Sequence, residues 1–188
     1  MDRNDWCPLV GMMDIAAKHN RGSIIEIGCG FGDTTVLLCE IAEQYGEKVI
    51  GIDPFDHNPE VHKSYNVYPY EFFVGRSDIA HWIQNGTFHL IRKSSNDPTV
   101  LDDLKQYGPF SCAYIDGVQT LDFVLNDLKL MDKVEVMRIG VDDYNRVTEV
   151  CQVQQGVEQF ARVHRYRPTA LIEHFVGTGR KTIILDRV

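Results

Sequence analysis

The stretch IIEIGCGFGDTT, residues 24–35, constrains the fold of this chain more than any other segment. Its β-branched isoleucines predict a strand, and the run that follows predicts a helix over residues 33–46. Between the two, single residues separate Gly28, Gly30 and Gly32. Glycines at this density let the backbone adopt positive φ and approach a ligand closely. The segment therefore predicts the first unit of a nucleotide-binding α/β fold.

Strands and helices are predicted to alternate along most of the chain, because β-branched runs and amphipathic runs take turns. The predicted strands span residues 23–28, 48–53, 88–93, 110–116 and 134–143, followed by a hairpin of 170–176 and 181–188. The predicted helices span residues 8–20, 33–46, 71–86, 97–108, 120–133 and 147–164. This order indicates a single α/β domain over residues 1–188, with a Rossmann-like, doubly wound, mainly parallel seven-stranded sheet that ends in an antiparallel hairpin.

Charge and cysteine usage narrow the class of protein. The net charge is -8 and no long Lys/Arg run is present, which argues against a nucleic-acid partner. The five cysteines include no CxxC pair, which favours reduced thiols in a cytoplasmic protein over a zinc site or a disulfide framework. No apolar run reaches the roughly 18 residues of a membrane span, so no membrane association is expected.

The spacing of the glycines and the neighbouring acids indicate which nucleotide the loop would hold. A dinucleotide-binding loop reads GxGxxG, whereas this one reads GxGxG and carries Asp33 where the third glycine should be. An acid suits a pyrophosphate poorly. Asp53, at the end of the next predicted strand, is placed to accept hydrogen bonds from ribose hydroxyls. Glu26, inside the first strand, favours an amine-bearing ligand. A phosphate-free nucleoside with an amino-acid tail fits all three features.

Four motifs in chain order, EIGCGFGDTT, GIDPF, AYIDG and VDDYN, resemble the class I S-adenosylmethionine-dependent methyltransferases. The resemblance covers roughly residues 22–163. Within this class, the motifs are most similar to those of the small-molecule O-methyltransferases of the catechol and macrolide-sugar type. It implies S-adenosylmethionine as the cofactor and a small hydroxylated molecule as the methyl acceptor.

The resemblance also implies which residues bind the cofactor. The three loop glycines would line its methionine part, with Thr34 at its carboxylate and Asp53 at its ribose. Ser94 and Ser95, after the third predicted strand, would lie near the adenine. The full expected set is Glu26, Gly28, Gly30, Gly32, Thr34, Asp53, Ser94, Ser95 and Asp116.

Three acids at the ends of the fourth and fifth predicted strands have two interpretations. In the similar metal-dependent enzymes, acids at the positions of Asp116, Asp142 and Asp143 bind Mg²⁺, whose preferred ligands are oxygens. A metal there would lower the pKa of an acceptor hydroxyl. Aspartates at strand ends also cap helices or make Asx-turns, and that alternative stays open.

The catalytic residues expected from the resemblance are Asp116 and Gln119. The similar enzymes carry a His or Lys three positions after the strand-end acid, and Gln119 stands there instead. An amide cannot abstract a proton at neutral pH. The substitution leaves open a metal-activated hydroxyl, a base from elsewhere such as His57, His62 or His81, or a weakly catalytic chain.

Two further questions stay open in the sequence. Residues 54–87 are rich in aromatic residues and proline, and they predict a lid over the acceptor or an insertion segment. A locally packed loop and a contact between two copies in a homodimer are the alternatives. The function also has two alternatives to methyl transfer. One is a cofactor-binding or scaffold protein of the same fold, motivated by Gln119. The other is an NAD(P)-binding oxidoreductase, which the acid in the glycine loop disfavours.

Overall fold

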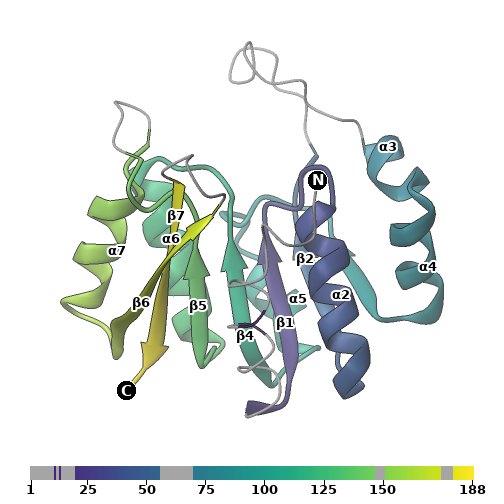
Figure 1. The fold of residues 1–188 in the computed structure, drawn as a ribbon, viewed down its shortest axis with the longest axis horizontal. Coiled ribbons are helices and arrows are strands. Elements are labelled where there is room, and N and C mark those ends of the chain that lie inside the picture. Colours follow the sequence, from purple (N-terminus) through teal and green to yellow (C-terminus); the bar gives the residue numbers. More distant parts are fainter. Residues whose placement is uncertain (1–10, 12, 14–19, 56–69, 147–150, 175–179) are drawn as a thin grey trace.

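A single seven-stranded sheet in the order β3-β2-β1-β4-β5-β7-β6 organises the computed structural model (Figure 1). The structure describes residues 11, 13, 20–55, 70–146, 151–174 and 180–188. The first five strands are parallel, and β7 runs antiparallel between β5 and β6. The strands are β1 (Ser23–Ile27), β2 (Val49–Ile52), β3 (Phe88–Ile91), β4 (Phe110–Ile115), β5 (Arg138–Val141), β6 (Tyr166–His174) and β7 (Arg180–Arg187). The predicted fold class, with its closing hairpin, is confirmed.

Helices pack on both faces of the sheet because successive side chains of each strand point to opposite sides. In β1, Ile25 and Ile27 belong to one apolar cluster, and Ile24 belongs to the other. The first cluster includes side chains of α5 (Val100–Lys105), α6 (Leu121–Lys133) and α7 (Val153–Ala161). The second includes side chains of α2 (Asp33–Tyr45), α3 (Tyr70–Gly75) and α4 (Ser77–Asn85). Figure 1 shows α2 and α4 on the same side of the sheet.

Several predicted boundaries were wrong. The helix expected over residues 71–86 is two helices, because Arg76 between α3 and α4 has an extended backbone with ψ 130°. The helix expected over 147–164 begins at Val153 among the described residues, and the strand expected over 134–143 begins at Arg138. The predicted helix 8–20 lies mostly outside the described residues, as do residues 56–69 of the predicted lid and the tip of the hairpin.

The C-terminal ends of the parallel strands meet at one edge of the sheet. The glycine loop follows β1, Asp53 follows β2, Asp116 follows β4, and Asp142 follows β5. From β1, an interior strand, the chain crosses to β2 on one side, while β4 lies on its other side. In open α/β sheets the crevice at such a switch point is the usual place for a ligand. None of the helices in the described ranges is long and apolar enough to cross a membrane.

Candidate functional site

The structure favours glycine at positions 28, 30 and 32 of the loop for different reasons. Gly28 has φ +87°, and a Cβ there would lie 2.3 Å from the backbone oxygen of Asp116. Gly32 has φ +84° and precedes α2, where a Cβ would crowd the ring of Phe73 at 3.0 Å. Gly30 has φ +49°, and its Cβ would meet nothing within 4 Å among the described residues. The loop is thus packed against protein at its two ends and open at its middle.

Asp53 shapes this loop as well as standing beside it. Its Oδ2 accepts hydrogen bonds from the backbone N–H groups of Cys29 (2.9 Å) and Gly30 (3.1 Å). Its Oδ1 accepts one from the N–H of Phe55 at 2.8 Å. A carboxylate offers about four acceptor sites, so three bonds leave room for about one more donor. Asp53 therefore lies where the ribose prediction requires it, and it has a second task that the sequence did not indicate.

Glu26 is a buried acid with one unpartnered oxygen. Its side chain is 0% exposed, and Thr35 of α2 donates a 2.6 Å hydrogen bond to Oε2. Oε1 has no hydrogen-bond partner among the residues that the structure describes. Burial, opposed in part by side-chain hydrogen bonds from Thr35 and Cys29, raises the pKa of Glu26 to about 8. A buried oxygen without a partner is costly, and an amine-bearing ligand could provide the missing donor.

The first turn of α2 offers donors to an anion. Gly32 precedes the helix in a left-handed conformation, and within the described part of the chain no side chain caps its N-terminus. The first N–H groups of a helix lack intrahelical partners and lie at the positive end of its dipole. Thr34 lies in this turn, as the prediction for a ligand carboxylate requires. Together with the open side of Gly30 and the spare oxygen of Glu26, these donors fit the amino-acid tail of S-adenosylmethionine.

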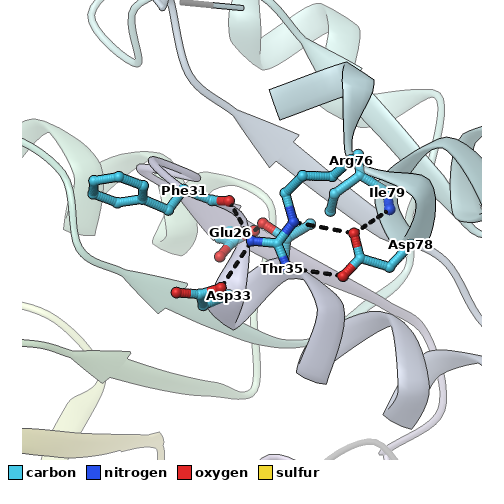
Figure 2. A network of polar contacts seen from close by, with 7 residues as sticks. All are labelled: Glu26, Phe31, Asp33, Thr35, Arg76, Asp78 and Ile79. Carbon is cyan, nitrogen blue, oxygen red and sulfur yellow. Dashed lines mark hydrogen bonds and ion pairs between the residues drawn. The ribbon is translucent and has the colours of Figure 1, made fainter. Parts of the chain in front are cut away.

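Arg76 fastens the glycine loop to the neighbouring helix pair, as Figure 2 shows. Its Nη1 donates to the carbonyl oxygen of Phe31 (2.7 Å) and to Asp33 Oδ1 (2.8 Å). Its Nε and Nη2 donate to the two carboxylate oxygens of Asp78 in α4, at 3.0 and 2.8 Å. The acid that replaces the third glycine of a dinucleotide loop is thus an ion-pair partner. The sequence carried no signal for Arg76, because its loop partners lie more than forty residues away.

An Arg76→Ala variant should loosen the loop more than it destabilises the fold. The ion pairs are partly exposed, so we expect a loss of about 1–2 kcal/mol in the free energy of unfolding. Amide hydrogen exchange at Phe31–Thr34 should accelerate clearly, because the clamp on the Phe31 carbonyl is removed. Asp78→Asn is the matched control, since it weakens only the α4 half of the contact. Unchanged exchange in the loop of the Arg76 variant would contradict a clamping role.

The predicted adenine residues lie after β3 and are held by α6. The side-chain amide of Asn126 donates to the carbonyl oxygen of Ser95 at 3.0 Å, and Ser94 Oγ accepts from the N–H of Asn96 at 3.3 Å. Asp127, 1% exposed, lies next to this contact. Burial raises the pKa of Asp127 to about 7, against the lowering effect of hydrogen bonds from Ser95 and Asn126. This loop is therefore positioned independently of the glycine loop.

The three predicted metal ligands come together at the ends of β4 and β5. One carboxylate oxygen from each of Asp116, Asp142 and Asp143 lies within 4.8 Å of the others. Asp116 reaches the surface, whereas Asp142 and Asp143 are buried. The surrounding protein desolvates the carboxyl group of Asp116, and the negative charges of Asp142 and Asp143 also disfavour its ionised form. Both effects raise the pKa of Asp116 well above its ordinary value.

The carboxylate of Asp143 is already occupied by protein donors. Arg180 of β7 donates from Nε to Oδ1 (2.7 Å) and from Nη2 to Oδ2 (2.8 Å), in a bidentate pair. Arg146 Nη1 at 3.3 Å and the amide of Gln119 also donate to Oδ2. Burial alone would raise the pKa of Asp143, but the hydrogen bonds from Arg180 and Gln119 and the charge of Arg180 lower it.

These contacts bear on two predictions. The residues present do not fit a site in which all three acids coordinate Mg²⁺, because a guanidinium holds both oxygens of Asp143. Coordination by Asp116 and Asp142 stays a prediction. The predicted catalytic residue Gln119 donates to Asp143, which shows it as a member of this cluster and leaves any role toward an acceptor untested.

The fold and this edge of the sheet define a Rossmann-like methyltransferase. Residues 25–144 match the family described as "Methyltransferase domain", and the chain belongs to that family. No curated protein matches the chain.

Solved structures with the same fold include an O-methyltransferase from Bacillus cereus in complex with SAH. Its TM-score is 0.62 at 15% identity, over 100% of this chain and 82% of that one. The O-methyltransferase TomG from Streptomyces achromogenes, in complex with SAM, gives 0.61 at 17% identity, over 96% and 80%. CalS11, a TDP-rhamnose 3'-O-methyltransferase, gives 0.62 at 14% identity, over 98% and 80%.

Proposed function

We propose that this chain binds S-adenosylmethionine and transfers its methyl group to an oxygen of a small hydroxylated acceptor. The observation that carries the proposal is the join between β1 and α2. There an open glycine backbone, an uncapped helix start and a buried carboxyl with one unpartnered oxygen lie together. When bound, the cofactor supplies an electrophilic methyl group on a sulfonium sulfur. Membership of the methyltransferase family supports the same activity.

In this proposal different residues of the chain bind different parts of the cofactor. The N–H groups at the start of α2, with Thr34, bind the carboxylate of its amino-acid tail. Glu26 Oε1 accepts from its amino group, and the remaining acceptor site of Asp53 takes a ribose hydroxyl. The loop after β3, with Ser94 and Ser95, lies toward the adenine. Gly30 leaves room for the backbone of the loop to approach the ligand closely.

The acceptor half of the proposal centres on Asp116. It reaches the surface at the end of β4, where its carboxylate, in the ionised form, can accept the hydroxyl proton as the methyl group is transferred. Val118, 44% exposed, and Phe31, 47% exposed, follow β4 and β1 and supply apolar surface nearby in the chain. Small hydroxylated acceptors are proposed because several solved neighbours of the same fold are O-methyltransferases, one of them a TDP-rhamnose 3'-O-methyltransferase.

Calorimetry with S-adenosylhomocysteine tests the cofactor assignment. We expect binding at sub-millimolar concentration and none of comparable strength for NADH. Asp53→Ala should weaken S-adenosylhomocysteine binding by at least about tenfold, since it removes the ribose acceptor and three supports of the loop. Ser95→Ala, the comparison variant, removes the hydroxyl bond to Asp127 but leaves the bond from Asn126 to the Ser95 carbonyl, so it should weaken binding less. The reverse order would place the ribose elsewhere, and NADH binding in place of S-adenosylhomocysteine would refute the assignment.

One observation favours a second function, a cofactor-binding or scaffold protein with little catalysis. Gln119 stands where the similar enzymes carry a basic residue, and its amide is engaged with Asp143. A methyl-transfer screen over catechols, sugars and hydroxylated macrolides, with and without a chelator, separates the two. Turnover of any of them supports the enzyme. Retained S-adenosylhomocysteine binding with no turnover across the screen would favour the scaffold.

A further inference from the structure

The cluster of Asp116, Asp142 and Asp143 has an electrostatic problem that the protein must solve. Three carboxylates lie within 4.8 Å of one another, and two of them are buried. Like charges at this distance repel, and burial removes the water that would screen them. A cation among them is the ordinary solution. In a metal-dependent site that cation is a divalent ion.

In this chain a guanidinium stands beside the cluster. Arg180 makes a bidentate pair with Asp143, at 2.7 and 2.8 Å, while the Asp143 side chain is 0% exposed. The planar fork of arginine matches a carboxylate in this geometry, and its charge is retained at every accessible pH. The charges of Asp143, Asp142 and Asp116 all help to raise the pKa of Arg180. The positive charge of Arg180 is therefore shared with the whole cluster.

The topology of the sheet fixes this arrangement. β7 runs antiparallel to β5, with Ile183 opposite Val141, so the start of β7 lies beside the end of β5. Arg180 and Thr182 are two residues apart in β7 and therefore point to the same side. Arg180 reaches Asp143, and Thr182 Oγ1 donates to Asp142 Oδ1 at 2.8 Å. One strand thus supplies a donor to each of the two adjacent acids.

The acceptor capacity of Asp143 leaves little for a metal. Oδ2 accepts three bonds, from Arg180, Arg146 and Gln119, which fill that oxygen, while Oδ1 accepts one from Arg180 and keeps about one acceptor site beside the guanidinium. Asp143 itself has φ +53°, a left-handed backbone that costs energy for a non-glycine residue and is retained where its surroundings hold it. A divalent ion that used Asp143 would have to displace a guanidinium from a buried carboxylate.

We infer that Arg180 is the resident cation of this acidic cluster and occupies Asp143 in place of a divalent metal ion. Wild-type protein then has no tight divalent site at Asp116, Asp142 and Asp143, and removing Arg180 creates one. This inference concerns the chain's own residues and does not depend on methyl transfer. Its failure and the failure of the proposed function are therefore separable.

Titration with Mn²⁺, followed by electron paramagnetic resonance after chelator treatment and desalting, tests the inference. Mn²⁺ takes the same oxygen ligands as Mg²⁺ and is directly observable. Wild-type protein should show no sub-millimolar site, whereas Arg180→Ala should bind Mn²⁺ at least about tenfold more tightly than the wild type. Arg180→Ala with Asp143→Asn should lose the gained site, which locates it.

Arg187→Ala is the matched control because it removes the same charge from the other end of β7, where Arg187 pairs with Glu135. It should behave as the wild type does. Arg180→Gln, which keeps an amide donor, replaces Arg180→Ala if circular dichroism shows that the alanine variant is unfolded. Sub-millimolar Mn²⁺ binding by wild-type protein that Asp143→Asn abolishes would overturn the inference. Absence of any gain in a folded Arg180 variant would overturn it too.

Discussion

Gly28→Ala is expected to abolish S-adenosylhomocysteine binding and to destabilise the fold by more than about 4 kcal/mol. A Cβ at this position would lie 2.3 Å from the backbone oxygen and 2.7 Å from the carbonyl carbon of Asp116. Both contacts are with backbone, so no side chain can rotate away. The φ of +87° adds strain of its own. Relief requires that the end of β4 move away from β1, which separates the two halves of the candidate site.

Gly30→Ala is the matched control in the same loop. Its φ of +49° lies in the left-handed region, and its Cβ would meet nothing within 4 Å in the described parts of the chain. We expect a loss of only about 1–2 kcal/mol in the free energy of unfolding. The new methyl group should still weaken S-adenosylhomocysteine binding, because it projects from the open side of the loop. Urea unfolding and calorimetry on both variants separate the effects. Equal stability of the two variants would rule out the close approach at Gly28.

The stability of the protein is expected to fall as the pH rises, because of Glu26. Its pKa is raised from 4.5 to about 8, so the folded protein holds a proton that the unfolded chain releases. The stabilisation is complete below the unfolded pKa and is lost as the pH rises through the folded pKa. A shift of this size corresponds to roughly 5 kcal/mol at most.

Glu26→Gln isolates this contribution from other titrating groups such as Asp127. The difference in the free energy of unfolding between wild type and variant, from urea curves, should fall by several kcal/mol between about pH 5 and about pH 9. If the amide of the variant changes the free energy of unfolding by a constant amount, this offsets the difference equally at every pH and does not change its dependence on pH. A flat difference over this range would show that Glu26 titrates normally. Bound S-adenosylhomocysteine should reduce the slope, because its amino group would favour the charged carboxylate.

The sequence predicted the sheet and the glycine loop well because their signals are local. Short β-branched runs, closely spaced glycines and acids at strand ends each depend on a few consecutive residues. The parallel arrangement of the strands then places their C-terminal ends at one edge of the sheet, so no further sequence signal is needed to bring these residues together. Asp53 and Glu26 were proposed as site residues in this way, and their roles toward a ligand stay predictions. The break at Arg76 between α3 and α4 was missed.

The two arginines that define the site's charge balance could not be predicted. Arg76 meets Asp33 from 43 residues away, and Arg180 meets Asp143 from 37 residues away. A single arginine in a strand or between helices has no periodic signature, and its partner depends on tertiary packing. The three acids lie together at the ends of β4 and β5, as their places at strand ends indicated, but the cation beside Asp143 comes from the closing hairpin, in which no site residue was predicted.

The two roles of Asp53 limit how the cofactor specificity of this protein can be engineered. The same carboxylate holds the bend of the glycine loop and stands where the proposed ribose would bind. A change there cannot retune the choice of nucleoside without also reshaping the loop that is proposed to bind the amino-acid tail. The adenine end is different, because Asn126 supports the Ser95 backbone from a separate helix. Directed evolution toward base-modified cofactors should therefore accumulate changes around Ser95, while ribose-modified cofactors should remain out of reach of single substitutions.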